Sequence, residues 1–226
     1  MLPHVKFSIK YQKKGKVMTR IYLIRHGQTV FNLMHKIAGQ IETDLTELGK
    51  KQALDCALNL KNQNIKFDAI LCSTLKRAKD TAEIIASVIE APVFYDDDLK
   101  EFSNGVYEGV QVEDLQKMVF NPPYQTGGFE FSSGADLYAA YSSFDAKYDG
   151  LSYPKGESKK AACNRFMNAI ERYLDAHPNT QNLGVVAHGA VIRFALLKIC
   201  PESLKEKIKN AEARVVYYGK YRGFYA

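Results

Sequence analysis

A short apolar segment near the N-terminus leads directly into a group of polar residues. Ile21 to Ile24 is a run of four apolar residues, and Arg25, His26 and Gly27 follow it at once. Such runs, bounded by a turn signal, are typical of a buried strand in a parallel sheet, and ligands bind such sheets at the carboxyl ends of the strands. These three residues are expected at such an end, although the tripeptide alone fits an ordinary strand-to-loop turn better.

Segments with strand and helix patterns alternate along the rest of the chain. Further strands are expected at 67–72, 92–95, 184–187 and 213–221, and helices at 46–60, 73–90, 112–119, 158–177 and 190–199. Thr46 and Ser158 are suited to cap two of these helices, because their hydroxyl oxygens accept hydrogen bonds from first-turn amides. The alternation predicts the α/β class: a three-layer α/β/α sandwich with a mainly parallel sheet.

The length and composition fit one globular domain. The chain has 226 residues, of which 46% are hydrophobic and 25% are charged, which is ample for one core. No apolar run is long enough to span a bilayer, and the N-terminus lacks an apolar stretch followed by a small-residue cleavage site. We therefore expect a cytoplasmic protein with no membrane partner.

The positive charge is concentrated in a short leader. The net charge is +6, and residues 1–20 hold six Lys and Arg side chains with no acidic residue, so the remainder is formally neutral. We expect residues 1–18 to be a solvated or disordered arm and 19–226 to form the single domain. Met18 leaves open that translation starts there. A basic leader on a neutral body does not predict a nucleic-acid partner.

The cysteines suggest neither a metal cluster nor a disulfide framework. Cys56, Cys72, Cys163 and Cys200 are far apart and form no C-x-x-C pair. None lies in a loop of the kind that stabilises a thiolate, so a catalytic cysteine is not expected. They are interpreted as reduced thiols of the core.

Two histidines occupy equivalent positions in the expected sheet. His26 and His188 each follow an apolar strand and precede a glycine, and Arg77 lies in the first turns of the helix after the second strand. In a parallel sheet these ends meet at one edge. A lone histidine beside an apolar strand is more often a structural residue, but two of them, together with Arg25 and Arg77, indicate a site.

The residue types in this group suit a tetrahedral anion. Two guanidinium groups and one protonated imidazole would offer hydrogen-bond donors that match phosphate oxygens. The other imidazole, if neutral, is a nucleophile that can attack phosphorus. Backbone amides at the helix starts would add further donors.

Seven motifs follow one another from about residue 20 to residue 195. They are Arg25-His26-Gly27-x-Thr29-x-x-Asn32, Leu45-Thr46-x-x-Gly49-x-x-Gln52-Ala53, Ser73-x-Leu75-x-Arg77-Ala78-x-x-Thr81-Ala82, Leu99-x-Glu101, Glu108-Gly109, Gly156-Glu157-Ser158 and His188-Gly189. In this order they resemble the motifs of the histidine phosphatase (phosphoglycerate mutase-like) superfamily. The resemblance implies the phosphoglycerate mutase-like fold and phosphoryl transfer without a metal or other cofactor.

The resemblance also implies a role for each site residue. His26 would be the phosphorylated nucleophile, Glu101 the proton donor to the leaving oxygen, and Arg25, Arg77 and His188 would clamp the phosphoryl group. Gly27, Thr29, Asn32 and Gly189 would bind the substrate. Ser103-Asn104-Gly105 departs from the usual pattern beside Glu101, so Glu108 remains an alternative acid. Glu157 is expected to order the pocket or a loop.

The reaction is expected to be hydrolysis of a small phosphomonoester. A mutase must retain a bisphosphorylated intermediate, which calls for basic residues over the pocket. The stretch 118–146 has no Lys or Arg and is rich in aromatic residues, and an insertion of about 110–155 is expected to cover the pocket. Phosphoglycerate mutase-type transfer is the first alternative and a non-catalytic phosphate-ligand binder is the second, and a homo-oligomer is left open. A metal held by His26 and His188 is disfavoured by the adjacent arginines.

Overall fold

The computed structural model describes residues 18–117, 124–126, 128–143, 146–200, 208–219 and 223–226. The leader expected at 1–18 lies outside these residues, apart from Met18, which begins the first strand. Parts of the aromatic stretch at 118–146 also lie outside them. No helix in the described ranges has the length and apolar character needed to cross a bilayer.

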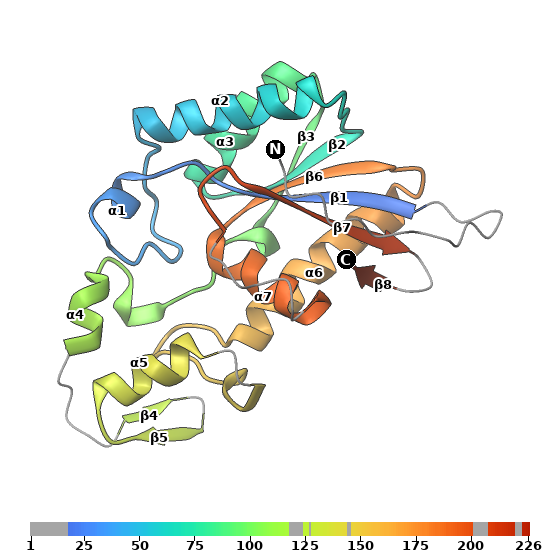
Figure 1. Ribbon diagram of the computed structural model, residues 1–226. Helices are drawn as coiled ribbons and strands as arrows, with labels where there is room; N and C mark the ends of the chain where they lie inside the picture. The colour runs from blue at the N-terminus through green and yellow to red at the C-terminus, as the bar shows by residue number, and fades with distance from the viewer. Residues whose placement is uncertain (1–17, 118–123, 127, 144–145, 201–207, 220–222) are drawn as a thin grey trace.

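One six-stranded sheet forms the middle of the molecule, in the order β3-β2-β6-β1-β7-β8 (Figure 1). The strands are β1 (Met18–Arg25), β2 (Ala69–Ser73), β3 (Val93–Asp96), β6 (Asn182–Ala187), β7 (Ala213–Gly219) and β8 (Gly223–Tyr225). The first four named are parallel neighbours, while β7 and β8 are antiparallel. The α/β sandwich with a mainly parallel sheet is confirmed.

Helices cover both faces of the sheet (Figure 1). One layer holds α2 (Glu47–Asn62) and α3 (Lys76–Ile89), and the other holds α6 (Lys159–Ala176) and α7 (Gly189–Ile199). The expected caps are confirmed, because Thr46 accepts from the amide of Gly49 and Ser158 from that of Ala161.

Alternation along β1 supplies both cores. Ile21 and Leu23 pack on the α6 and α7 side, while Tyr22 and Ile24 pack on the α2 and α3 side, and all four are at most 3% exposed. Each buried aliphatic side chain of this size contributes about 1.5–3 kcal/mol of transfer free energy. The strand that leads to His26 is therefore anchored on both faces.

The chain between the third strand and α6 forms a separate lobe, at the lower left of Figure 1. It contains α4 (Val112–Lys117), the hairpin of β4 (Tyr124–Thr126) and β5 (Phe129–Phe131), α5 (Gly134–Ser142) and the 3-10 turn η3 (Ala146–Tyr148). A third hydrophobic cluster, with Leu115, Leu137 and Tyr153 among its members, fills this lobe. The hairpin and α5 lie in a stretch that was expected only as an aromatic insertion.

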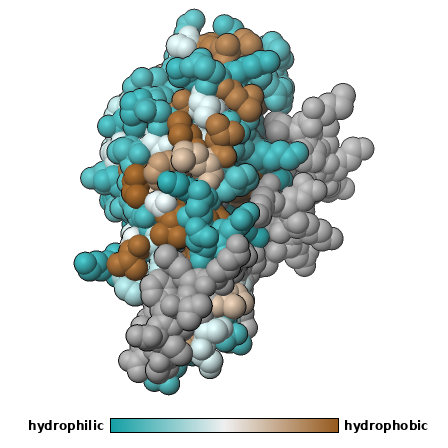
Figure 2. All heavy atoms as spheres, turned by 90° about the vertical axis from the view of Figure 1, so that its left-hand side faces the viewer, coloured by the Kyte–Doolittle hydropathy of each residue, from teal (hydrophilic) through white to brown (hydrophobic). Residues whose placement is uncertain are grey.

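Three short helical turns lie near the carboxyl ends of the strands: α1 (Val30–Leu33), η1 (Asp97–Leu99) and η2 (Gly105–Tyr107). On the side of α1, large apolar side chains are exposed at Val30, Leu33, Met34 and Leu48. Figure 2 looks at this side and shows apolar surface between hydrophilic residues.

Candidate active site

The pairing of β1 with β6 brings the two histidines together. Arg25 is the register partner of Ala187, so the next residues, His26 and His188, leave the sheet side by side, and the His26 amide donates to the carbonyl of Ala187 at 3.0 Å. The two imidazole centroids are 5.2 Å apart. Both side chains are buried. Their predicted meeting at one sheet edge is what the structure shows.

Arg77 lies in α3, the helix that follows β2, and its side chain reaches the two histidines. Its Nε donates to Nδ1 of His188 at 3.2 Å, and its Nη1 and Nη2 donate to the carbonyls of Ile41 and Gly39 at 2.8 and 2.7 Å. A guanidinium has five N–H donors, so two are left for a ligand after these three bonds. The side chain is only 1% exposed, which holds the charge in a fixed place.

Arg25 supplies the second guanidinium. Its Nη1 donates to the carbonyl of Ile208 at 2.7 Å, while its Nε is buried and has no partner among the described residues. A Cβ added to Gly189 would lie 3.1 Å from this Nε, so the guanidinium lies against the start of α7. A buried charged donor without a partner is costly and indicates a place for an anion.

Hydrogen bonds fix the tautomers of both imidazoles. Nδ1 of His26 lies 2.7 Å from the carbonyl of Gly27, which can only accept, so Nδ1 carries the proton and Nε2 keeps its lone pair. Nδ1 of His188 must accept from Arg77, so Nε2 of His188 is the donor to the hydroxyl of Ser73 at 2.7 Å. The nitrogen of His26 that can attack an electrophile is therefore Nε2.

Both histidines are neutral at ordinary pH. Burial, and then the charges of Arg77 and Arg25, lower the pKa of His26 well below 6.5; burial and Arg77 do the same to the pKa of His188. The sequence predicted one protonated imidazole. With only the protein's own charged groups present, this prediction is wrong. A third buried cation beside two guanidinium groups is too unfavourable.

Glu101 lies between the third strand and the start of α7. Its Oε1 accepts from the amides of Phe102 and Val191 at 2.9 and 3.0 Å, and its Oε2 accepts from the amide of Ala190 at 3.1 Å. Oε2 thus keeps a second lone pair, on which a proton can sit. Among the carboxyl groups of the site in the described residues, only that of Glu101 accepts hydrogen bonds from backbone amides of α7.

Glu108 lies close by in a different setting. Its Oε1 accepts from the hydroxyl of Ser103 at 3.2 Å and from the amide of Asn104 at 3.0 Å. A Cβ on Gly39 would lie 2.3 Å from the same oxygen, which places Glu108 against a residue that Arg77 holds. Glu108 therefore stays within the site as the alternative acid.

The loop after His26 is held by internal hydrogen bonds. The amide of Gly27 donates to the hydroxyl of Thr81, and its carbonyl accepts from His26. Thr29 is fully buried and shares a capping box with Asn32 at the start of α1. These contacts give Gly27 and Thr29 a role in shaping the loop, and substrate binding by them stays a prediction. Asn32 uses Oδ1 internally, which leaves its Nδ2 as the group that can donate to a ligand.

The sequence reasoning missed two polar residues in this site. Nδ2 of Asn210 donates to the carbonyl of His26 and to Oδ1 of Asn32, and Ser73 accepts from His188. Asn210 lies in no motif, so no local signal could have found it. Ser73 stands at the end of the second strand, a position that could have been included.

The fold and this group of side chains define a site for phosphoryl transfer, with a neutral imidazole, two guanidinium groups and a carboxyl at one sheet edge. The family model of the histidine phosphatase superfamily (branch 1) matches residues 21–130 and 124–224. The chain belongs to this superfamily.

Several known proteins are similar over most of the chain. A metal-independent phosphoserine phosphatase of Arabidopsis thaliana is 36% identical over 215 residues, which covers 93% of this chain and 82% of that protein. The uncharacterized phosphatase PhoE of Bacillus subtilis is 31% identical over 197 residues, which covers 86% of each. The relatives named as phosphatases support hydrolysis.

Solved structures share the fold. The phosphoglycerate mutase of Bacillus anthracis matches with a TM-score of 0.75 at 23% identity, covering 90% of this chain and 89% of that one. A mycobacterial glucosyl-3-phosphoglycerate phosphatase in complex with VO3 matches with a TM-score of 0.69 at 24% identity, covering 88% and 90%. The phosphoglycerate mutase-like fold is confirmed.

Proposed function

We propose that this protein hydrolyses small phosphomonoesters through a phosphohistidine on His26. The observation that carries the proposal is the pairing of a neutral imidazole, whose Nε2 keeps its lone pair, with the buried Nε of Arg25, which has no partner in the part of the chain that the structure describes. A nucleophile and an anion-binding donor then lie on the same strand end. This is what attack on a bound phosphate ester requires.

The first step forms the N–P bond and breaks the P–O bond of the ester. Nε2 of His26 donates its electron pair to phosphorus, and the leaving alkoxide takes a proton from the carboxyl of Glu101. Arg25 and Arg77 neutralise charge on the non-bridging oxygens throughout. His188 holds Arg77 through its Nδ1 and contributes to the same wall.

The second step returns the enzyme to its starting state. Glu101, now ionised, removes a proton from water as the water oxygen attacks phosphorus, and the N–P bond breaks with its electrons returning to Nε2. Inorganic phosphate leaves. The proton that Glu101 gave to the alcohol is thereby recovered from the water.

The charge around the site favours hydrolysis over mutase-type transfer. Burial lowers the pKa of Arg77, and three carboxylates, Glu101, Glu42 and Glu108, oppose this shift. Lys159, a buried lysine of α6, points its amine at the carbonyls of Ala140 and Ser143. These carboxylates would oppose the binding of a second phosphate group beside Arg77.

A substrate screen with a nucleophile variant tests this function. The panel comprises alkyl phosphomonoesters, including phosphoserine because a relative bears that name, and p-nitrophenyl phosphate. We expect phosphate release by the wild-type protein, an acid-labile phosphoenzyme, and no phosphoenzyme with His26→Ala. Retained activity in His26→Ala would refute the mechanism, and isomerisation of 3-phosphoglycerate that outpaces phosphate release would replace hydrolysis by the mutase reaction.

We also propose a cytoplasmic location and a homo-oligomeric state. The four free cysteines support the first, since reducing compartments keep thiols unpaired. The exposed apolar side chains around α1 support the second. Cell fractionation and light scattering of the purified protein test these two points, and a secreted or strictly monomeric protein would refute them.

A further inference from the structure

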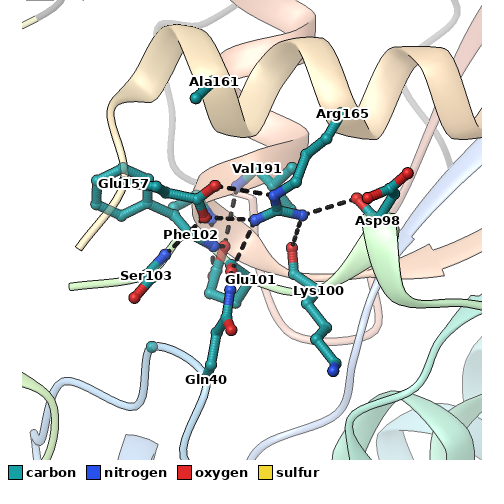
Figure 3. A network of polar contacts seen from close by, with 12 residues as sticks. Gln40, Asp98, Lys100, Glu101, Phe102, Ser103, Glu157, Ala161, Arg165 and Val191 are labelled. Carbon is teal, nitrogen blue, oxygen red and sulfur yellow. Dashed lines mark hydrogen bonds and ion pairs between the residues drawn. The ribbon is translucent and has the colours of Figure 1, made fainter. Parts of the chain in front are cut away.

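One arginine of α6 holds the backbone that carries Glu101. Nη1 of Arg165 donates to the carbonyls of Asp98 and Lys100 at 2.7 Å each, and its Nη2 donates to the carbonyl of Glu101 at 2.9 Å (Figure 3). Three carbonyls within four residues thus point at one guanidinium. This segment has no helix or strand of its own beyond η1, so side-chain bonds must fix its path.

Glu157 completes the arrangement from the start of α6. Its Oε2 accepts from Nε of Arg165 at 2.9 Å and its Oε1 from Nη2 at 2.5 Å, a bidentate pair whose side chains are each 19% exposed. The same Oε1 accepts from the amide of Ser103 at 2.8 Å. Arg165 and Glu157 therefore hold the backbone before Glu101, at residues 98 and 100, and after Phe102, at Ser103.

Every N–H group of this guanidinium is used. Its five donors meet five acceptors, three of them backbone carbonyls and two of them oxygens of Glu157. A lysine at this position has three donors and no planar fork, so it keeps the charge and loses the geometry. On the other side of the segment, the amides of Ala190 and Val191 donate hydrogen bonds to the carboxyl of Glu101.

We propose that Arg165, paired with Glu157, is the positioning residue that aims the carboxyl of Glu101 at the leaving oxygen. The recorded hydrogen bonds of Arg165 go to the carbonyls of residues 98, 100 and 101 and to Glu157, and none goes to the carboxyl of Glu101 or to His26. Its charge also contributes to the low pKa of His188, and Arg165→Lys keeps that charge. This inference rests on the proposed function, because it takes Glu101 to be the proton donor. It follows that weakening the hydrogen bonds of Arg165 slows the reactions that need a proton donor. Reactions that need none keep their rate.

The choice of leaving group separates positioning from a general structural role. An alkoxide needs a proton as it leaves, whereas p-nitrophenolate is stable without one. The measurement is kcat/KM, which reports the step that breaks the P–O bond, for p-nitrophenyl phosphate and for the alkyl phosphomonoester that the screen identifies. The ratio of the two values does not depend on the fraction of enzyme that is folded.

The variants are Arg165→Lys and Glu157→Gln, with Glu101→Gln as the reference. We expect both to lower kcat/KM for the alkyl ester by about 10–100-fold, in line with a misplaced catalytic group, and that for p-nitrophenyl phosphate by less than about threefold. Arg172→Lys is the matched control. Arg172 lies two turns further along α6 and pairs with the carboxylates of Asp96 and Asp98, but its side chain is 55% exposed and contacts no backbone carbonyl of 98–103 in any bond the structure records.

The outcomes are decisive in both directions. A selective loss with the alkyl ester in Arg165→Lys, absent from Arg172→Lys, supports the proposal. A ratio equal to that of the wild-type protein overturns it, and so does an equal change of ratio in the control. His26→Ala tests the phosphohistidine reaction separately, and we expect it to lose activity with both the alkyl ester and p-nitrophenyl phosphate. If it does, an unchanged ratio in Arg165→Lys contradicts only the role of Arg165.

Discussion

The Nε of Arg77 lies 3.2 Å from Nδ1 of His188, and this contact requires an unprotonated Nδ1. Arginine has no acceptor, so Nδ1 must be unprotonated for the bond to exist. A proton on Nδ1 would place two positive groups at hydrogen-bond distance. Burial and the charge of Arg77 thus hold the pKa of His188 low and keep it neutral, and the positive charge available to an anion comes from the two arginines.

Acid should destabilise the fold through its two buried histidines. Their pKa values in the folded state lie well below 6.5, the value of the unfolded chain, so both states are neutral above pH 6.5. As the pH falls below 6.5, only the unfolded state binds protons, and the free energy of unfolding decreases by up to about 1.4 kcal/mol per pH unit for each histidine. The decrease continues until the pH reaches the folded-state pKa.

Urea unfolding at pH 7.5 and 5.5 measures this effect. In His188→Asn, whose Oδ1 can accept from Arg77, the loss of stability between the two pH values should be smaller than in the wild-type protein. His177→Asn, at an exposed histidine outside the site, is the control for removing a histidine. Equal pH dependence in the wild-type protein and His188→Asn would contradict the neutral buried state.

Replacing Arg25 by lysine should weaken phosphate binding although the charge is kept. The buried Nε, which has no partner among the described residues, is lost, and so is the planar fork that matches two phosphate oxygens. We expect the inhibition constant of inorganic phosphate to rise by about 10–100-fold, as for the loss of one or two charge-assisted hydrogen bonds. Arg20→Lys, at the opposite end of β1, should bind phosphate as the wild-type protein does.

Two glutamates compete for the role of proton donor, and glutamine variants should distinguish them. Glu101→Gln should lower kcat/KM for an alkyl ester by about 10²–10⁴-fold, the usual contribution of general acid catalysis, and leave that for p-nitrophenyl phosphate nearly intact. Glu108→Gln should show no such selectivity, because its Oε1 already orders Ser103 and Asn104. If the selective loss appears in Glu108→Gln instead, Glu108 is the acid.

Gly27 should not tolerate a side chain. A Cβ at this position would lie 2.2 Å from the carbonyl oxygen of Gly49, and backbone cannot move away as a flexible side chain can. Gly27→Ala should therefore lower the free energy of unfolding by about 1–3 kcal/mol and displace His26. Thermal melting and phosphatase activity measure the two effects. Gly150→Ala is the control, because a Cβ there meets no described residue within 4 Å, and an unaffected Gly27→Ala would refute the tight contact.

Periodicity was enough to predict the layered part of the fold. The apolar run at 21–24, the stripe of α6 and the caps Thr46 and Ser158 are local signals, and the structure has each of them in the expected element. The turn α1 was missed, since four residues held by a capping box carry no apolar period. The strands of the lobe hairpin are three residues long, too short for alternation to be visible.

The site was predictable where strands deliver it and not where distant loops complete it. His26, His188 and Arg77 come from elements whose ends meet by the rules of parallel sheets. The bonds of Asn210 and Arg165 to the carbonyls of His26 and Glu101 join residues more than 60 positions apart, and a single sequence gives no measure of such distances. The charge of His188 was predicted wrongly for a related reason, because burial and the approach of Arg77 are properties of the packed site.

The ladder between β1 and β6 has a consequence for how the site can fail. Side chains alternate between the two faces of a sheet, so a slip of one residue between these strands would send one imidazole toward α2 and the other toward α6. No register of these two strands that is shifted by one residue keeps His26 and His188 on the same face of the sheet. During refolding, catalytic activity should therefore not return before this ladder has closed in its native register.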